Sequence, residues 1–398
     1  MFELLPTLPA DPILGLTVEC RADTNLNKVD LGVGVFKDES GNTPVLAAVK
    51  EAERQYFDTE QSKAYLPAGG TPRFIGLVND LVFGSGHPAL QQQRVVTIQG
   101  TGGCGSLRVA AELIKRANSS ARIWISDPSW PNHSALLGSS GLGFCQYPYY
   151  DQNSNSIPFE QMLAALAEAE AGDLVLIHAC CHNPSGADLS EAQWQAVTEL
   201  AKKNGFIPFI DMAYQGFGQS LEADAYGIRY MAEQLPELVV ANSFSKNFGL
   251  YRERVGSVSI VVKDPNLVAT VNGQMMNIAR TIYSMPPAHG AALVETVLAD
   301  TQLRQKWQEE LGQMRDRIKS LRSALVQELK NLGCSRDFSF IEAQQGMFSF
   351  LGLSKSQVEQ LKTAYSIYMV DSSRISICGL NSKNMNYVAR AIVDVVDK

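Results

Sequence analysis

One lysine stands in surroundings in which an amine could act as a nucleophile. Lys246 lies in the segment Asn242–Gly256, between two strand-like runs and among small polar residues. A lysine amine can condense with an aldehyde, and its reactivity rises when the surroundings disfavour its ammonium form. Nearby, Ser243, Ser245 and Arg254 supply hydroxyl groups and a planar cation suited to a phosphate. A single lysine is usually a solvated surface residue, but these neighbours favour a functional one.

A glycine-rich loop, Gly100–Gly105 (GTGGCG), separates a predicted strand from a predicted helix. Its backbone N–H groups, at a helix N-terminus, could face a phosphate. The loop also matches the G-x-G-x-x-G pattern of dinucleotide-binding folds, and Asp127 ends the next predicted strand, about where such a fold places its acidic residue. A tight turn without a ligand is a third interpretation. The loop alone therefore leaves an NAD-dependent oxidoreductase open.

Two more segments follow apolar strands and carry groups suited to a pyridine ring. Asp211 ends a strand, and a carboxylate there could keep a ring nitrogen protonated, so that the ring acts as an electron sink. Tyr214 could hydrogen-bond a phenolate oxygen, and the amide of Asn183 could donate to the same oxygen. Asp211 is about equally well explained as the N-cap of a following helix when this segment is considered alone.

The run His178–His182 (HACCH) contains two histidines and two cysteines, which superficially resemble metal ligands. Side chains of successive strand residues point to opposite faces, so these four cannot all point one way. The sequence contains no second cluster of such residues with zinc-site spacing. We therefore predict no metal site.

Three further side chains could bind a planar cofactor or an acidic substrate. Trp130 could stack on a ring, although a tryptophan more often fills a core. Arg280 and Arg374 could each grip a carboxylate bidentately, and the two together would select a dicarboxylate. Singly, each arginine is more often part of a surface ion pair, and spacing alone does not join them.

These residues are expected to be positioned by a sheet covered with helices. From about residue 95 to 300, short apolar runs alternate with helical patterns such as Leu107–Lys115 and Glu191–Lys203. This alternation predicts an α/β fold with a mainly parallel sheet, in which ligands collect beyond the carboxyl ends of the strands. The predicted strands are Arg94–Gln99, Arg122–Ser126, Asp173–His178, Phe206–Ile210, Leu238–Ala241 and Val255–Val262.

A long helix is predicted over about Thr301–Leu332, because apolar residues recur every three or four positions along it. Gly333 is a plausible stop. The elements predicted beyond it, in a smaller α+β domain, are strands at Gly346–Leu351 and Arg374–Cys378 and a helix at Asn384–Val396. We expect residues 1–44 to form an N-terminal arm and part of the small domain, 45–310 the large domain and 311–398 the rest of the small domain.

The bulk composition is that of a globular protein. The chain has 398 residues, 45% of them hydrophobic and 19% charged, and its net charge of -7 argues against a nucleic-acid partner. Its seven cysteines are odd in number and lack CxxC spacing, so a disulfide framework is not expected. The N-terminal segment lacks a basic region and carries Asp11, which fits neither a signal peptide nor a membrane span. We expect a cytoplasmic protein that does not bind membranes.

Together these segments closely resemble the class I (fold type I) aminotransferases, specifically the bacterial aspartate and aromatic amino-acid aminotransferases. The likeness runs along nearly the whole chain and keeps many long segments in one order. They are ADPILGL, LGVGVFKDESG, the glycine-rich loop, DPSWPNH, CCHNPSGADL, DMAYQGFG, NSFSKNFGLYRERVG, YSMPPAHG, GMFSF and RISICGLN. The resemblance implies the fold type I architecture of a large cofactor-binding domain and a smaller α+β domain.

The resemblance implies pyridoxal 5'-phosphate as the cofactor. Lys246 looks like the lysine that holds it as a Schiff base and moves the proton between the substrate α-carbon and cofactor C4′. Asp211 is similar to the partner of the ring nitrogen, and Tyr214 and Asn183 to the contacts of the phenolate oxygen. The residues similar to the phosphate-binding set are Gly102, Gly103, Cys104, Gly105, Ser243, Ser245 and Arg254. Those similar to the ring-stacking residue and to the support of Asp211 are Trp130, His133 and His178.

The resemblance also implies amino-acid and 2-oxo-acid substrates and a homodimer with shared active sites. Arg374 resembles the clamp on the substrate α-carboxylate, helped by Gly34 and Asn183, with Trp130 above the ring. Tyr65 would reach the phosphate, and Arg280 the distal carboxylate, in the neighbouring subunit's site.

This sequence departs from the family pattern at several positions. Cys104 stands where these enzymes usually have Ser or Thr, and a thiol is a weaker donor to a phosphate, so we expect looser cofactor binding. Arg252 is bulkier than the residue usual at its position. Ala64 and Met285 lack the polarity typical of strict aspartate enzymes. The positions that look aspartate-like are Val35, Lys37 and Thr43.

The function predicted from the sequence is transamination between aspartate, with aromatic amino acids as further substrates, and 2-oxoglutarate. A mainly aromatic enzyme with secondary aspartate activity is the alternative. An NAD-dependent oxidoreductase would leave Lys246 and Arg374 unexplained. A catalytically silent relative is disfavoured because the proposed lysine, acid, tyrosine and arginines are all present, and another reaction on the same cofactor, such as β-decarboxylation, stays open.

Overall fold

The computed structural model describes residues 1–7 and 13–398. Part of the N-terminal ADPILGL segment, residues 10–12, lies outside the described residues. The chain divides into a larger compact unit, Pro44–Asp316, and a smaller one formed by Met1–Thr43 and Arg317–Lys398.

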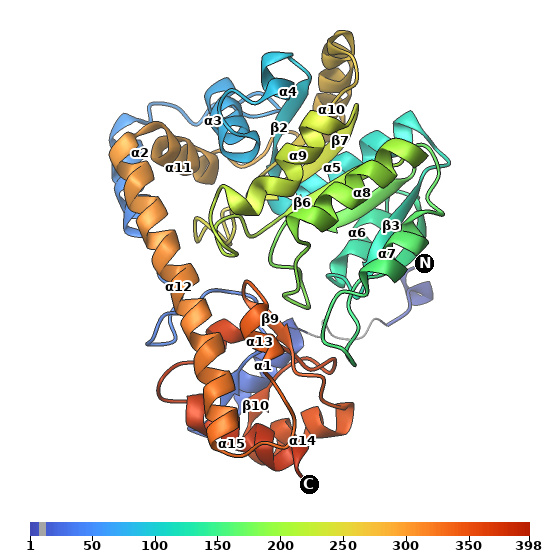
Figure 1. Ribbon diagram of the computed structural model, residues 1–398. Coiled ribbons are helices and arrows are strands. Elements are labelled where there is room, and N and C mark those ends of the chain that lie inside the picture. Colours follow the sequence, from blue (N-terminus) through green and yellow to red (C-terminus); the bar gives the residue numbers. More distant parts are fainter. Residues whose placement is uncertain (8–12) are drawn as a thin grey trace. The chain divides into compact units, whose positions relative to one another are not determined.

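The larger unit is built on a seven-stranded sheet with the strand order β2-β8-β7-β6-β5-β3-β4 (Figure 1). The strands from β7 to β4 run parallel, whereas β8 is antiparallel to both of its neighbours. The prediction of an α/β fold with a mainly parallel sheet is confirmed. In chain order the strands are β2 (Val95–Thr101), β3 (Arg122–Asp127), β4 (Gly143–Pro148), β5 (Leu174–His178), β6 (Ile207–Met212), β7 (Leu238–Ser243) and β8 (Val255–Val261).

The six strands predicted for this sheet are present, each within two residues of its predicted ends. Strand β4 was not predicted. It lies at an edge of the sheet and its first residues are largely exposed, including Phe144 at 41%. An edge strand with a solvent-facing surface carries no continuous apolar run by which a sequence would reveal it.

Helices cover both faces of the sheet (Figure 1). On one face α5 (Gly102–Ala117) packs against β2, β7 and β8, and α10 (Val268–Tyr283) packs against α5. On the other face α9 (Tyr226–Gln234) packs against β7 and contacts α3 (Pro72–Phe83) and α8 (Glu191–Asn204). The further helices and turns of this unit are α2 (Ala47–Thr59), α4 (Pro88–Gln91), α6 (Asn132–Gly138), α7 (Phe159–Leu166), α11 (Ala288–Ala299), η2 (Ala223–Ala225) and η3 (Pro265–Leu267).

The ends of α8 illustrate how local sequence sets these elements. The Ser190 side chain accepts from the Gln193 N–H while the Gln193 side chain accepts from the Ser190 N–H, which satisfies two donors at the helix start. The helix ends at Gly205, whose φ of 77° is the left-handed conformation that glycine adopts at low cost. Capping at both ends thus fixes the length of the element between β5 and β6.

The predicted long helix is present as α12 (Thr301–Asn331). The boundary between the two units falls inside it, at Asp316 and Arg317. Its predicted apolar stripe is buried, from Trp307 to Leu329, and Gly333 follows it with a φ of 73°. The prediction of a glycine stop is therefore confirmed.

The smaller unit contains two short two-stranded sheets. In one, β1 (Val29–Asp30) pairs in parallel with β10 (Ile367–Tyr368); in the other, β9 (Phe348–Phe350) pairs antiparallel with β11 (Arg374–Ser376). The predicted strands Gly346–Leu351 and Arg374–Cys378 were both too long. The first is limited to Phe348–Phe350, and the second ends early because Ile377–Gly379 forms the turn η4. The other elements are η1 (Phe2–Leu4), α1 (Leu14–Ala22), α13 (Phe340–Ala343), α14 (Lys355–Tyr365) and α15 (Met385–Val396).

Across residues 1–7 and 13–398, no helix has both the length and the apolar character needed to cross a bilayer.

Candidate active site

The directions of the strands explain why the predicted site residues of the larger unit gather at one edge of the sheet. Strands β5, β6 and β7 run parallel, so Asn183, Tyr214 and Lys246, which follow them, emerge at the same edge. Strand β8 runs the opposite way, and the register pairs its first residue, Val255, with Thr101 at the end of β2. The loop after β2 and the segment before β8 therefore meet at this edge as well.

The start of α5 and residues 243–254 form one cluster of hydrogen-bond donors. Gly102 has a φ of 67°, and a Cβ there would overlap the Arg254 guanidinium; a Cβ at Gly103 would lie 3.2 Å from the Ser243 Cβ. Arg254 Nη1 donates to Ser245 Oγ at 3.3 Å, and the Ser243 and Ser245 hydroxyls are 3.2 Å apart. Two hydroxyls, a guanidinium and the first N–H groups of a helix converge here, a donor set that fits a phosphate.

Cys104 and Gly105 follow in the first turn of α5. The Cys104 side chain is half-buried, and Asn132 Nδ2 donates to its Sγ at 3.9 Å. The thiol thus stands beside the donor cluster, where the sequence predicts a weaker phosphate contact than a hydroxyl would make. That weaker contact stays a prediction.

Lys246 lies between β7 and β8, and its Nζ is 4.8 Å from the centroid of the Tyr214 ring. Loss of hydration lowers the pKa of Lys246, and the nearby Asp211 carboxylate opposes this shift only in part. A lowered pKa increases the neutral fraction of the amine, which is its nucleophilic form.

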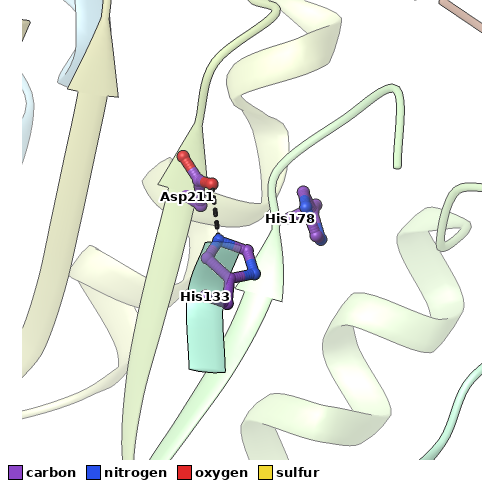
Figure 2. Close-up of side chains that lie close together, drawn as sticks. All are labelled: His133, His178 and Asp211. Atoms are coloured by element: carbon purple, nitrogen blue, oxygen red, sulfur yellow. Dashed lines mark hydrogen bonds and ion pairs between the residues drawn. The ribbon is translucent and has the colours of Figure 1, made fainter. Parts of the chain in front are cut away.

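Asp211 lies in β6, is 5% exposed and accepts a hydrogen bond from His133 Nε2 at 3.0 Å (Figure 2). The Ser129 hydroxyl lies 2.9 Å from the other ring nitrogen, Nδ1, and can donate to it while Nε2 carries the proton. Burial by itself raises the pKa of Asp211, but the hydrogen bond from His133 and nearby positive charge outweigh it, so that the pKa is lowered. The position thus holds an ionised carboxylate in a buried place.

His178 ends β5 beside this pair (Figure 2) and is opposite Asp211 in the strand register. Its ring centroid lies 5.2 Å from that of His133 and 4.4 Å from that of His182. Burial lowers the pKa of His178 to about 3, so the ring is neutral at pH 7. Among the described residues, its Nε2 finds no hydrogen-bond partner although it is buried. The expected support of Asp211 is thus a direct bond from His133 and a neutral neighbour in His178.

In the described part of the chain, one group of side chains could hold a metal ion: His133, His178 and Asp211. His178 is the one residue of the HACCH run in this group. The carboxylate of that group already accepts the His133 hydrogen bond. The absence of a metal site stays a prediction.

Asn183 and Tyr214 are both buried, at 6% and 4% exposure, on neighbouring loops at the same sheet edge. Trp130 is half-buried: it packs against the core cluster and meets the His133 ring edge-on, with 5.2 Å between centroids. The core interpretation of this tryptophan is therefore met in part, and its role as a stacking surface for a cofactor stays a prediction.

Arg374 and Gly34 belong to the smaller unit, where both lie against Phe348. The Arg374 guanidinium carbon is 4.4 Å from the centroid of the Phe348 ring, and its Nη2 donates to Gly32 O at 2.6 Å. A Cβ at Gly34 would lie 2.7 Å from Phe348 Cζ, so glycine permits this close backbone approach. A buried guanidinium oriented by a ring and a carbonyl is suited to gripping a carboxylate.

Tyr65 and Arg280 lie on the surface of the larger unit. The Tyr65 side chain is 89% exposed, and Arg280 is exposed in the last turn of α10. The Leu66 N–H donates to Met285 Sδ at 3.3 Å, which joins the loop carrying Tyr65 to the segment after α10. The role of both residues in a neighbouring subunit's site stays a prediction.

The strand order argues against the dinucleotide-binding interpretation of Gly100–Gly105. In that fold the acidic residue ends the strand next to the one that precedes the glycine loop. Asp127 ends β3, and four strands lie between β3 and β2. At the usual strand spacing these two strands are more than about 20 Å apart, so Asp127 cannot share a ligand with the loop in that way.

Three residues at this edge were not predicted from the sequence. Ser129 contacts the His133 ring, Asp188 accepts backbone N–H groups beside Asn183, and Asp224 does the same in the loop after Tyr214. Their signal in the sequence is a short polar side chain a few positions from a motif, which fits an ordinary turn equally well.

Comparison with known proteins gives one family. The family model described as "Aminotransferase class I and II" matches residues 27–392. An aspartate aminotransferase of Haemophilus influenzae is 47% identical over 396 residues, covering 100% of both chains.

Solved structures agree with this match. The crystal structure of an aromatic-amino-acid aminotransferase from Burkholderia pseudomallei, covalently bound to pyridoxal phosphate, has a TM-score of 0.98 and 46% identity, and covers 100% of this chain and 99% of that one. A psychrophilic aromatic amino acids aminotransferase from Psychrobacter sp. B6, cocrystallised with aspartic acid, has a TM-score of 0.97 and 43% identity, and covers 100% of both chains.

Proposed function

The chain belongs to the family of class I and II aminotransferases, and we propose that it transfers an amino group between aspartate or an aromatic amino acid and 2-oxoglutarate, with pyridoxal 5'-phosphate as its cofactor. The observation that carries this proposal is Lys246: a lysine of lowered pKa between an ionised, buried Asp211 and a cluster of phosphate-type donors. The Burkholderia pseudomallei structure, with its covalently bound pyridoxal phosphate, supports the choice of cofactor.

The residues of the larger unit fit this cofactor group by group. Ser243, Ser245 and Arg254, with the N–H groups that begin α5, would bind its phosphate. Asp211 would bind its ring nitrogen, and Asn183 and Tyr214 its phenolate oxygen. When bound, the cofactor accepts the electron pair that the substrate retains on losing its α-proton.

Lys246 has two tasks in this proposal. Its Nζ would hold the cofactor covalently between turnovers, and as a free amine it would accept the substrate α-proton. A lowered pKa suits the second task, because the amine must be neutral to accept a proton. An ionised Asp211 would favour a positive charge on the ring nitrogen of the bound cofactor.

The substrate carboxylates would be read by arginines. Arg374 would bind the α-carboxylate, with Gly34 leaving room beside Phe348. The apolar Ala64 and Met285 suit an aromatic side chain, whereas Lys37 and Thr43 look aspartate-like. A mainly aromatic enzyme with secondary aspartate activity is the second candidate, and the aromatic enzyme of Psychrobacter cocrystallised with aspartic acid supports a site that admits both classes.

The enzyme would work as a homodimer in the cytoplasm. Tyr65 and Arg280, both exposed on this chain, would complete the neighbouring subunit's site at the phosphate and at the distal carboxylate. All seven cysteines lie in the described part of the chain as free thiols, which agrees with a reducing compartment.

The first test is the visible absorption spectrum of the purified protein supplied with pyridoxal phosphate. A yellow band that either aspartate or phenylalanine bleaches, when each is added to a separate sample, is the expected result, and the relative rates rank the two substrate classes. The Lys246→Ala variant should lack the band, whereas Lys202→Ala, a substitution on the surface of α8, should keep it. A protein that stays colourless with added cofactor would contradict the proposal.

A further inference from the structure

Two acidic side chains without a part in the proposed function each close a loop at the carboxyl edge of the sheet. Asp188 closes the loop that follows β5, and Asp224 closes the loop that follows β6. Both accept hydrogen bonds from backbone N–H groups. They therefore fix backbone shape, which is the property on which the direction of a neighbouring side chain depends.

Asp188 binds the two residues that immediately precede Asn183. Its Oδ2 accepts from the Cys181 N–H at 2.7 Å, and its Oδ1 accepts from the His182 N–H at 2.9 Å. Cys181 has a φ of 52°, a left-handed conformation that costs a non-glycine residue about 1–2 kcal/mol. Two successive N–H groups pointing at one carboxylate offset that cost and hold the turn.

Hydrogen bonds also hold the turn that follows, over residues 182–186. The His182 carbonyl accepts from the Gly186 N–H at 2.7 Å, and the His182 ring contacts the Ser185 hydroxyl at 2.8 Å. Asn183 thus lies within a loop whose two ends are fixed by hydrogen bonds on either side of it.

Asp224 binds three N–H groups in the loop that presents Tyr214. Its Oδ2 accepts from Gly216 at 2.8 Å and from Gly218 at 2.9 Å, and its Oδ1 accepts from Gln219 at 2.8 Å. The Tyr214 carbonyl is held in turn by the Phe217 N–H at 3.0 Å. Asp224 is 5% exposed, so few water molecules could replace it as an acceptor.

The two loops belong together because β5 and β6 are neighbouring parallel strands, and the side chains they carry are the two proposed donors to one oxygen. We propose that Asp188 and Asp224 are positioning residues, which hold Asn183 and Tyr214 so that both donate to the phenolate oxygen of the bound cofactor. This inference rests on the proposed function of Asn183 and Tyr214.

An amide cannot replace either carboxylate. Asn has one acceptor oxygen, and its NH2 group would face a backbone N–H that now has no acceptor. Loss of a positioning bond would let the loop relax and weaken the donor it carries. Hydrogen bonds to an anionic oxygen stabilise its charge and loosen its hold on the proton shared with the lysine–cofactor linkage. Weaker donors therefore raise the apparent pKa at which that linkage loses its proton.

The experiment is a pH titration of the visible band of the holoprotein, for Asp188→Asn and Asp224→Asn separately. Each substitution should raise the apparent pKa of the band by about 0.5 to 1 unit, the shift expected when a hydrogen bond to a charged group is weakened. Asp188→Asn is the primary variant, because Asp188 is only half-buried and its loss disturbs the core less.

Asp173→Asn is the matched control. Asp173 is also 5% exposed and also accepts backbone N–H groups, from Arg122 and Glu170, and in addition pairs with the Arg122 guanidinium at 2.6 Å; it precedes β5 at the opposite edge of the sheet. The Asp173→Asn substitution should lower the urea-unfolding midpoint and leave the apparent pKa of the visible band unchanged. A shift as large as that of Asp188→Asn would mean that general loosening, rather than positioning, moves the band, and would overturn the inference.

A second comparison asks whether each carboxylate acts through its partner. In an Asn183→Ala background, Asp188→Asn should shift the pKa no further, and in a Tyr214→Phe background the same should hold for Asp224→Asn. An unchanged band in both single variants, or a full shift in the paired backgrounds, would reject the positioning role. If the unsubstituted protein forms no visible band, the proposed function fails instead, which is a distinct result.

Discussion

Asp211 lies between two histidines that act on it in different ways. His133 donates a hydrogen bond to the carboxylate, and the Ser129 hydroxyl contacts its other ring nitrogen. His178 makes no such bond within the described chain, and burial keeps it neutral. One histidine thus stabilises the charge of the carboxylate directly through a hydrogen bond, while the other lies beside it as a neutral ring at pH 7.

The neutrality of His178 predicts a pH dependence of stability. Its pKa is about 3 in the folded protein and 6.5 without the fold, so between these values the unfolded chain binds a proton that the folded chain does not. The free energy of unfolding therefore falls as the pH decreases from about 6.5 towards 3, by up to about 1.4 kcal/mol per pH unit from this residue.

The His178→Gln variant should lose less stability on acidification, because it lacks this titrating group. Urea unfolding of the cofactor-free protein between pH 4.5 and about 6.5 measures the slope, which should be shallower by about one proton. Gly273→Ala, which changes no titrating group and whose added Cβ would meet nothing within 4 Å, is the control and should keep the original slope. Equal slopes for His178→Gln and the unsubstituted protein would contradict the buried, neutral state.

At the scale of elements, the glycine-rich loop meets the segment that carries Arg254 because strand β8 is antiparallel to its neighbours. Strand β8 is antiparallel to β2 and β7, so its start lies beside the end of β2 and Arg254 reaches Gly102. Had β8 been parallel, the segment before it would have entered the sheet at the opposite edge. The donor cluster is thus a product of topology as much as of residue type.

The fit of Gly102 to Arg254 gives a second prediction. A Gly102→Ala substitution adds a Cβ that overlaps the Arg254 guanidinium, at a φ of 67° that L-residues adopt at a cost. We expect the dissociation constant of pyridoxal phosphate to rise by at least about tenfold, which corresponds to about 1.4 kcal/mol. Equilibrium dialysis of the apoprotein measures it.

Gly273→Ala is the matched control, because a Cβ at Gly273 in α10 meets nothing within 4 Å. That substitution should leave cofactor affinity unchanged and stabilise the helix slightly. An unaltered affinity in Gly102→Ala would exclude the proposed phosphate contact at the start of α5.

The elements that could be predicted from the sequence are those whose apolar pattern is complete. Strands such as Leu174–His178 are buried along their whole length, and α12, which is 31 residues long, carries a buried apolar stripe from Trp307 to Leu329. The edge strand Gly143–Pro148 carries no such pattern. The antiparallel direction of β8 could not be predicted either, because a fully buried strand is apolar whichever way it runs.

The site shows the same division. Lys246, Asp211 and Tyr214 could be proposed as site residues because their residue types are chemically specific and each lies at or just after the end of a strand. Asp188 and Asp224 could not, because their role depends on which N–H groups a folded loop turns inward. Residue type and spacing do not indicate which backbone N–H groups will point toward a carboxylate.

At the scale of the whole molecule, a shared site in a homodimer can be tested by complementation. Lys246→Ala and Arg280→Ala each damage both sites of a dimer. If the arginine acts on the neighbouring subunit's substrate, a mixed dimer of the two variants has one fully intact site.

Refolding an equal mixture of the two variants should therefore restore aspartate transamination to about a quarter of the unsubstituted activity, since about half of the dimers are mixed and each has one intact site of two. Each variant refolded alone is the control and should stay inactive with aspartate. A mixture no more active than the parents would show that both residues serve the same subunit.

The position of β2 in the sheet has a consequence for synthesis on the ribosome. Strand β2 ends at Thr101, and its one neighbour in the described sheet, β8, begins at Val255. At about 5–20 residues per second, the roughly 150 residues between them take about 8–30 s to translate. Throughout that interval the nascent chain carries an apolar strand with unpaired N–H and C=O groups, a template for pairing with other chains. The growing polypeptide is therefore most in need of a chaperone after β2 has been translated and before β8 has been completed.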